Sequence, residues 1–289
     1  MKSMNKILGA FVLCASIGAF TSCGDSGKEN TENQQPKDTT TSTVETETVS
    51  YSLPSPLQIA RIFKKSGLTY IDGLTNDQKD PSKYTSKFSK ALNMGIYSAD
   101  LAYNVMNKQK QGALSYMKLS KQLADDLGMG SAFEEGNIPE RFEKNLSNED
   151  SLTYIVAELQ MSTDTYLQDN EQQEISSIAF SGAWIESVYL GAKVFEKSKD
   201  AKLNNKISEQ MTILGQILKV LEKQKDKDSA ITGLITDLTS VKTVYDGLDS
   251  VKNFKPAEEG VSEVINLSEK EIETVSKTIV EVRGKFVKG

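Results

Sequence analysis

Two carboxylates, each set among aromatic side chains, are the residues of this chain best suited to chemistry. Asp100 lies in the segment GIYSADLAY and Glu186 lies in the segment GAWIESVY. The aromatic residues that could wall a cleft around them are Tyr97, Tyr103, Trp184 and Tyr189. Paired carboxyls about 5 to 10 Å apart, one with a raised pKa, are typical of glycosidases. Asp100 and Glu186 are therefore candidates for a ligand-binding or catalytic pair.

Helical spacing places each acid on an otherwise apolar stripe. The first stripe holds Leu92, Ile96, Ala99, Asp100 and Tyr103, and the second holds Ile178, Gly182, Ile185, Glu186 and Tyr189. Gly95 and Gly182 each cost a helix interior about 1 kcal/mol relative to alanine. We therefore expect the two helices to cross at these glycines, where the missing side chains allow the backbones to approach closely.

Three interpretations of the pair are open. In the structural interpretation each acid is buried and satisfied by a tyrosine hydroxyl, a lysine or a backbone amide, which sets the register of two core helices. In the others the acids bind a ligand or catalyse a hydrolysis. Shifted carboxyls mark functional sites only statistically, so the structural interpretation is favoured and no residue is assigned as catalytic.

The composition excludes several classes of mechanism. The chain has no histidine and two cysteines, Cys14 and Cys23, of which Cys14 lies in the predicted leader. A Ser-His-Asp or Cys-His nucleophile, an internal disulfide and a His or Cys zinc site are thus ruled out for the mature protein. The chain also lacks an Asp-x-Asp-x-Asp-Gly loop, a phosphate loop and a dinucleotide fingerprint. We expect no metal and no cofactor.

The N-terminal residues have the pattern of an export signal. Lys2 and Lys6 precede an apolar run from Ile7 to Phe20, which is too short to span a membrane, and Thr21-Ser22-Cys23 follows. This pattern resembles a bacterial lipoprotein signal, which implies cleavage after residue 22 and lipidation of Cys23. Loss of the two leader lysines leaves 32 basic and 40 acidic side chains, a formal charge of −8. Such an acidic chain is not expected to bind nucleic acid.

Three regions follow from these patterns: a signal peptide over 1–22, a lipidated cysteine with a disordered tether over 23–50, and one helical domain over 51–289. The tether, in which Val44 and Val49 are the only large apolar residues, would reach roughly 30 Å. Within the domain, capping residues, helical periodicity and the placing of glycine and proline predict helices over 55–67, 82–108, 112–127, 150–168, 171–197, 201–224, 229–248 and 262–287, with short pieces around Phe133 and Arg141.

The predicted fold class is all-α, as an antiparallel helical bundle or a short stack of helical pairs. A faint repeat suggests an internal duplication. At an offset of 86 residues Asp100 aligns with Glu186 and Tyr103 with Tyr189, while Gly95 and Gly182 differ by 87.

The signal, the polar tether and the helical body with its two motif segments resemble all-helical lipoproteins of Bacteroidota. The resemblance implies a Gram-negative envelope and the outer membrane, with the domain on either its periplasmic or its outer face, but it implies no activity. We expect a membrane anchor through lipid and a non-catalytic module that binds an envelope protein or a small ligand. The alternative is a carboxylate-dependent, glycan-directed hydrolase that uses Asp100 and Glu186.

Overall fold

The computed structural model describes residues 54–78, 81–254 and 265–288. These residues belong to one compact unit, Val49–Gly289. The predicted signal peptide, Cys23 and the tether lie outside the described residues. Where the chain is described it contains helices and turns and no strand, which confirms the all-α prediction.

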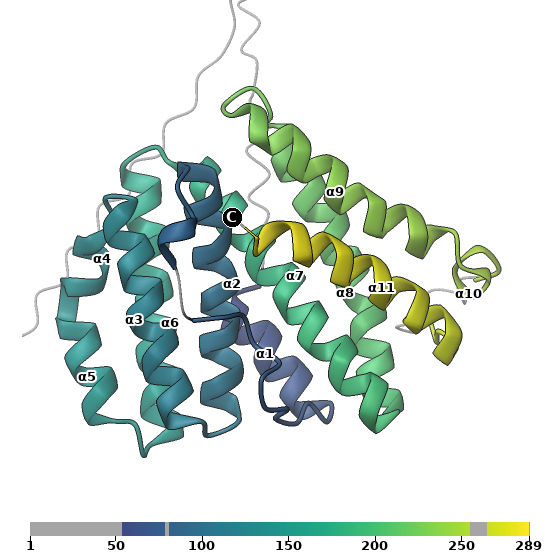
Figure 1. Ribbon diagram of the computed structural model, residues 1–289, viewed down its shortest axis with the longest axis horizontal. Helices are drawn as coiled ribbons and strands as arrows, with labels where there is room; N and C mark the ends of the chain where they lie inside the picture. Colours follow the sequence, from purple (N-terminus) through teal and green to yellow (C-terminus); the bar gives the residue numbers. More distant parts are fainter. Residues whose placement is uncertain (1–53, 79–80, 255–264, 289) are drawn as a thin grey trace, which may run out of the picture. The chain divides into compact units, whose positions relative to one another are not determined.

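The longer helices are α2 (Lys87–Met106), α3 (Lys110–Asp126), α6 (Glu149–Asp169), α7 (Gln173–Ser198), α8 (Ala201–Glu222), α9 (Ser229–Asp246) and α11 (Glu269–Phe286). The shorter ones are α1 (Pro56–Lys65), α4 (Gly130–Glu134), α5 (Ile138–Lys144) and α10 (Asp249–Lys252), with 3-10 turns η1 (Pro81–Lys83) and η2 (Glu135–Asn137). Figure 1 shows their arrangement.

Helix boundaries follow local capping chemistry. Ser55 and Gln58 form a reciprocal capping box at the start of α1, and Gly67, at a φ of +98°, follows its end as predicted. Three predicted starts are wrong. Helix α2 begins at Lys87, five residues later than predicted, after a capping box formed by Ser86 and Ser89. Helix α6 is capped by Asn148 rather than Asp150, because the Asn148 side chain accepts from the Ser151 amide. Helix α11 begins seven residues later than predicted, after a capping box at Ser268.

Helices α2 and α7 form the centre of the unit. Both are buried on nearly all sides from their second turn onward, as expected for helices that are apolar around their whole circumference. Helices α1 and α3 flank α2, whereas α8 and α11 flank α7. Helix α9 packs against α8 and α11. Helices α4, α5 and α6 pack together beside α2 and α3, on the side away from α9 (Figure 1).

The central helices run parallel. Lys87 and Glu174, in the first turns of α2 and α7, form an ion pair at 3.3 Å. The helices then cross at the two glycines, as predicted. A Cβ on Gly95 would lie 1.7 Å from the carbonyl oxygen of Ala179, and a Cβ on Gly182 would lie 2.0 Å from that of Leu92. Only glycine permits this backbone approach.

Helical pairs stack across this crossing. Helices α2 and α3 form an antiparallel pair, joined by a short turn and by the Lys90–Asp126 ion pair (3.1 Å) at their far ends. Helices α7 and α8 form a second pair. The fold thus follows the predicted stack of helical pairs, with the parallel α2–α7 contact at its centre. No helix in the described residues is both long enough and apolar enough to span a membrane.

Candidate functional site

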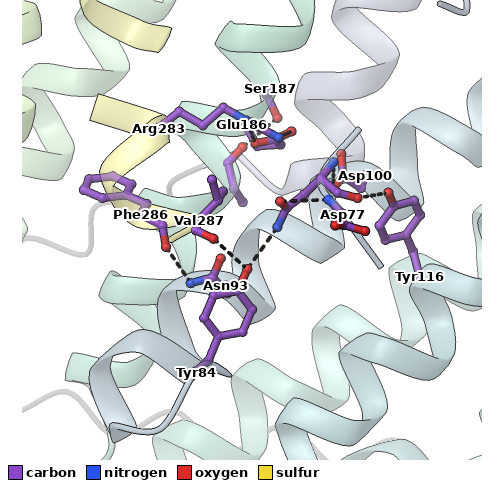
Figure 2. A network of polar contacts seen from close by, with 12 residues as sticks. Asp77, Tyr84, Asn93, Asp100, Tyr116, Glu186, Ser187, Arg283, Phe286 and Val287 are labelled. Atoms are coloured by element: carbon purple, nitrogen blue, oxygen red, sulfur yellow. Dashed lines mark hydrogen bonds and ion pairs between the residues drawn. The ribbon is translucent and has the colours of Figure 1, made fainter. Parts of the chain in front are cut away.

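Glu186 on α7 forms a bidentate ion pair with Arg283 on α11 (Figure 2). Arg283 Nε donates to Oε2 at 2.5 Å and Nη2 donates to Oε1 at 2.8 Å. The Glu186 side chain has no exposed surface and the Arg283 side chain is 13% exposed. The guanidinium also stacks on the ring of Tyr189, with 4.1 Å from Cζ to the ring centroid. Glu186 is therefore a buried carboxylate whose charge is matched by one arginine.

Asp100 on α2 has a different environment. Its Oδ2 accepts a hydrogen bond from the backbone N–H of Asn76 at 3.1 Å, and its Oδ1 has no partner. The side chain is fully buried and lies within hydrogen-bonding reach of Glu186. Burial, and then the negative charge of Glu186, raise the pKa of Asp100 well above its usual value, against the opposing effect of Arg283. Burial and the neighbouring charge thus favour the protonated form of Asp100.

The protonated form also suits the contact between the two acids. Two ionised carboxylates are both acceptors and cannot bond to each other, whereas a protonated Asp100 could donate a hydrogen bond to Glu186. The two carboxyls and the guanidinium then carry no net charge. A cluster without net charge has a lower free-energy cost of burial than one with an unmatched charge, because its three ionisable groups have almost no access to water.

Three tyrosines near Asp100 hold the segment between α1 and α2 in place. Tyr116 on α3 donates to the carbonyl of Asn76 at 2.5 Å, so it positions the residue whose amide binds Asp100. Tyr97 donates to the carbonyl of Asp77 at 3.1 Å. Tyr103 accepts from the Ile71 amide at 2.7 Å and donates to a carbonyl of the same segment, while burial raises its pKa to about 12. These rings are used in packing and hydrogen bonding rather than as cleft walls.

Trp184 forms a hydrogen bond to α8 rather than lining a cleft around the acids. Its ring is fully buried and its Nε1 donates to the carbonyl of Gln210 at 3.3 Å, which links α7 to α8. Tyr189, another of the four predicted wall residues, contacts the charged cluster because the Arg283 guanidinium stacks on its ring.

The end of α11 is fixed by polar side chains from outside it. Asn93 on α2 donates to the carbonyl of Phe286 at 2.9 Å, and Tyr84 donates to that of Val287 at 3.4 Å (Figure 2). These bonds satisfy carbonyls that a helix C-terminus leaves open. Together with the Arg283–Glu186 pair, they attach α11 to the central helices.

Sequence reasoning did not identify Arg283. It lies 97 residues from Glu186 and belongs to a helix for which no functional role was predicted. One signal was present, because the chain has only three arginines among its 34 basic residues. Arginine is preferred over lysine where a buried carboxylate needs a planar two-point partner. Arg141 also forms a two-point ion pair, with Glu158, through its two terminal nitrogens at 2.7 and 2.8 Å, but this pair is only partly buried.

The geometry favours the structural interpretation of the acids. Asp100 and Glu186 do converge, but both have zero exposed surface, so no open cleft reaches them. The two carboxyls also interact with each other, whereas the carboxyls of a glycosidase flank the bond that is cleaved. Among the described residues no group of three or more acids, histidines or cysteines is placed to hold a metal ion.

Comparison with known proteins identifies no relative: no protein-family model, curated protein or solved structure matches this chain. The functional conclusion therefore depends on the residues and contacts described above.

Proposed function

We propose that this chain is a lipid-anchored protein of the bacterial envelope whose helical domain is a non-catalytic module that binds a partner protein. The observation that supports a non-catalytic binding function is the burial of Asp100 and Glu186. Glu186 is paired with Arg283, Asp100 interacts with Glu186, and neither acid has surface available to a substrate. Binding through the outer surface of the domain is then the function that the geometry supports best.

The envelope location is supported by the N-terminal sequence. A basic start, a short apolar run and Cys23 after small residues are the features that direct lipidation. Two or three acyl chains anchor a protein stably, since each buried methylene adds about 0.8 kcal/mol. The polar segment that follows would let the domain stand off from the outer membrane.

Labelling with palmitate tests the anchor. In growing cells the wild-type protein should incorporate labelled palmitate and fractionate with membranes, whereas a Cys23→Ala variant should do neither. A matched Cys14→Ala variant should behave as wild type, because Cys14 lies within the segment that is removed. Continued labelling of the Cys23→Ala variant would refute the assignment.

Affinity capture tests the binding module. The full lipoprotein, purified from detergent-solubilised membranes, should recover one specific partner that an unrelated lipoprotein of similar abundance does not. Absence of such a partner, together with no ligand that raises the melting temperature, would count against the proposal. Hydrolysis of envelope glycans that is lost in both Asp100→Asn and Glu186→Gln would favour the hydrolase instead.

A further inference from the structure

Charge is distributed unevenly along the folded chain. Residues 130–171, which form α4, η2, α5 and α6, contain ten acidic side chains and two basic ones, Arg141 and Lys144, a net charge of −8. The remaining residues contain 30 acidic and 32 basic side chains, a net charge of +2. The segment that forms these helices is therefore strongly acidic, whereas the rest of the chain is close to neutral.

Helix α6 presents an exposed stripe within this acidic region. The stripe consists of Asp150, Tyr154, Ala157, Met161, Asp164 and Gln168, all exposed and spaced alternately by four and three residues. Tyr154 and Met161 are each 67% exposed, against 37% for the next most exposed large apolar side chains that the structure describes. Alternate spacing by three and four is that of a helix-pairing seam. The α6 stripe thus has an apolar centre between two acids.

The stripe is a second apolar face on a helix that is already anchored. The opposite face of α6 buries Leu152, Ile155, Val156, Leu159 and Leu167 against the domain. Packing within the domain therefore does not require Tyr154 or Met161 to be apolar. Large apolar residues that gather on an exposed face in this way are typical of protein-binding surfaces.

The two acids within the stripe, Asp150 and Asp164, differ from the acids beside it in having no ion-pair partner among the described residues. Glu149 pairs with Lys108 at 3.4 Å and Glu158 pairs with Arg141 at 2.7 Å. No cation in the described part of the chain pairs with Asp150 or Asp164, and α6 itself contains no lysine or arginine. The two free carboxylates lie 14 residues apart, about 21 Å along the helix at 1.5 Å per residue.

We propose that the α6 stripe is the docking surface for a basic amphipathic helix of a partner protein, an inference that rests on the proposed function of the domain. Apolar residues of that helix would pack against Tyr154 and Met161, with Ala157 between them allowing close approach. Its lysines or arginines, about four turns apart, would pair with Asp150 and Asp164. The acidic surroundings would speed its association and favour its orientation.

Charge also selects against other occupants. A second copy of this chain would bring one net charge of −8 against another, and like charges placed face to face cost free energy. An anionic lipid surface would be repelled for the same reason. The complementary surface is cationic and has an apolar centre, which is the chemistry of a basic amphipathic helix.

Site-specific photocrosslinking in cells that make the full lipoprotein tests the inference. A photoreactive phenylalanine analogue is placed at position 154 or 161, or at the control positions 62 and 280, which are moderately exposed apolar residues of α1 and α11. Positions 154 and 161 should give an adduct with one protein, and mass spectrometry should map it to an amphipathic helix with basic flanks. The controls should not give this adduct.

Affinity measured with a synthetic peptide of the mapped segment provides the second arm. The double variant Tyr154→Lys with Met161→Lys should weaken binding to the purified full chain by at least about tenfold. Val280→Lys should leave it unchanged. An unchanged melting temperature in both variants shows that they remain folded. Added salt should weaken binding to wild type, because the Asp150 and Asp164 pairs are screened.

Several outcomes overturn the inference and remain distinguishable from failure of the proposed function. Adducts only from position 62 or 280, or no adduct from 154 and 161 while affinity capture still recovers a partner, would leave the binding function intact and exclude the α6 stripe. An adduct with a second copy of this chain, or with a segment that is not basic, would also exclude it. If no partner is captured by any route, the binding function itself fails.

Discussion

At the scale of residues, two acids in similar sequence contexts have opposite roles. Glu186 forms an ion pair with Arg283, whereas the pKa of Asp100 is raised by burial and by the charge of Glu186. The cluster resembles a shared-proton carboxyl pair in its chemistry but not in its access to solvent. Substitution of either acid by its amide removes one oxygen, yet the two substitutions should have different consequences.

Asp100→Asn should preserve the cluster. An asparagine amide can still accept from the Asn76 amide and donate to Glu186, as the protonated acid does. In the wild type the folded state holds a proton that the unfolded state releases above about pH 4. Wild-type stability should therefore fall as pH rises from about 4 toward the folded pKa of Asp100, by up to about 1.4 kcal/mol per pH unit. The variant should lack this slope.

Urea unfolding of both proteins between pH 4 and pH 9 measures the difference. The variant should be close to wild type at pH 4 and more stable at the alkaline end. Parallel pH profiles for the two proteins would show that Asp100 is ionised in the folded state and would contradict the assigned proton.

Glu186→Gln should be the damaging substitution. It removes the carboxylate that pairs with Arg283 and leaves a guanidinium that is only 13% exposed. Breaking one side of a buried pair costs about 3 to 5 kcal/mol, and ionisation of Asp100 in response would reduce that cost. We expect a clear loss of unfolding free energy at pH 7, together with faster amide exchange in α11. Equal stability of this variant and Asp100→Asn would argue against the distinct roles.

At the scale of elements, the parallel crossing of α2 and α7 decides what can meet. Gly95 and Gly182 are 87 residues apart, as are Leu92 and Ala179. Gly95 lies against the backbone of Ala179, and Gly182 lies against the backbone of Leu92. This reciprocity is the geometry of a parallel crossing at two glycines. In that register Asp100 corresponds to Ser187, so the two acids are neighbours one residue out of register rather than equivalent positions.

Alanine at either crossing glycine should separate the helices. The new Cβ would clash with a backbone carbonyl oxygen, which cannot move as a flexible side chain would. Gly95→Ala and Gly182→Ala should each cost about 1 to 3 kcal/mol, and they should not be additive because they disturb one contact. Gly233→Ala in α9, where nothing lies within 4 Å of the added atom, should instead stabilise by up to about 1 kcal/mol. Chemical denaturation of the wild type and the three single variants measures these differences. A gain of stability in Gly95→Ala and Gly182→Ala, as in Gly233→Ala, would contradict the close crossing of α2 and α7.

At the scale of the whole molecule, the central pair joins the other helices into one core. Side chains from α1, α3, α8 and α11 pack on α2 or α7, and the cluster links α11 to both. The single tryptophan, Trp184, is buried within this core at the contact of α7 with α8. It therefore reports on central packing, whereas far-ultraviolet circular dichroism reports on all helices.

We expect thermal unfolding followed by Trp184 fluorescence and by circular dichroism to coincide, as in a cooperative transition. The Glu186→Gln variant should lose this coincidence if α11 detaches first. An early loss of helical signal in the wild type, with no change in fluorescence, would mean that α9 and α11 unfold independently of the core.

Local sequence patterns determined the elements of this protein and much of its centre. Capping residues and helical periodicity depend on neighbours a few residues apart, so α1, α7 and α8 lie close to their predicted ranges. The two interior glycines indicated the crossing for a similar reason, because their cost within a helix requires a compensating contact. The burial of both acids also follows from stripes that are otherwise apolar.

Tertiary structure alone decided how these elements face one another. The parallel direction of α7 relative to α2 places Asp100 beside Glu186, and the return of α11 brings Arg283 to them from 97 residues away. The different environments of the two acids and the exposed stripe on α6 follow from that packing. Such contacts depend on burial and distance between residues far apart in the chain, and no local pattern encodes which distant helix will supply the partner charge.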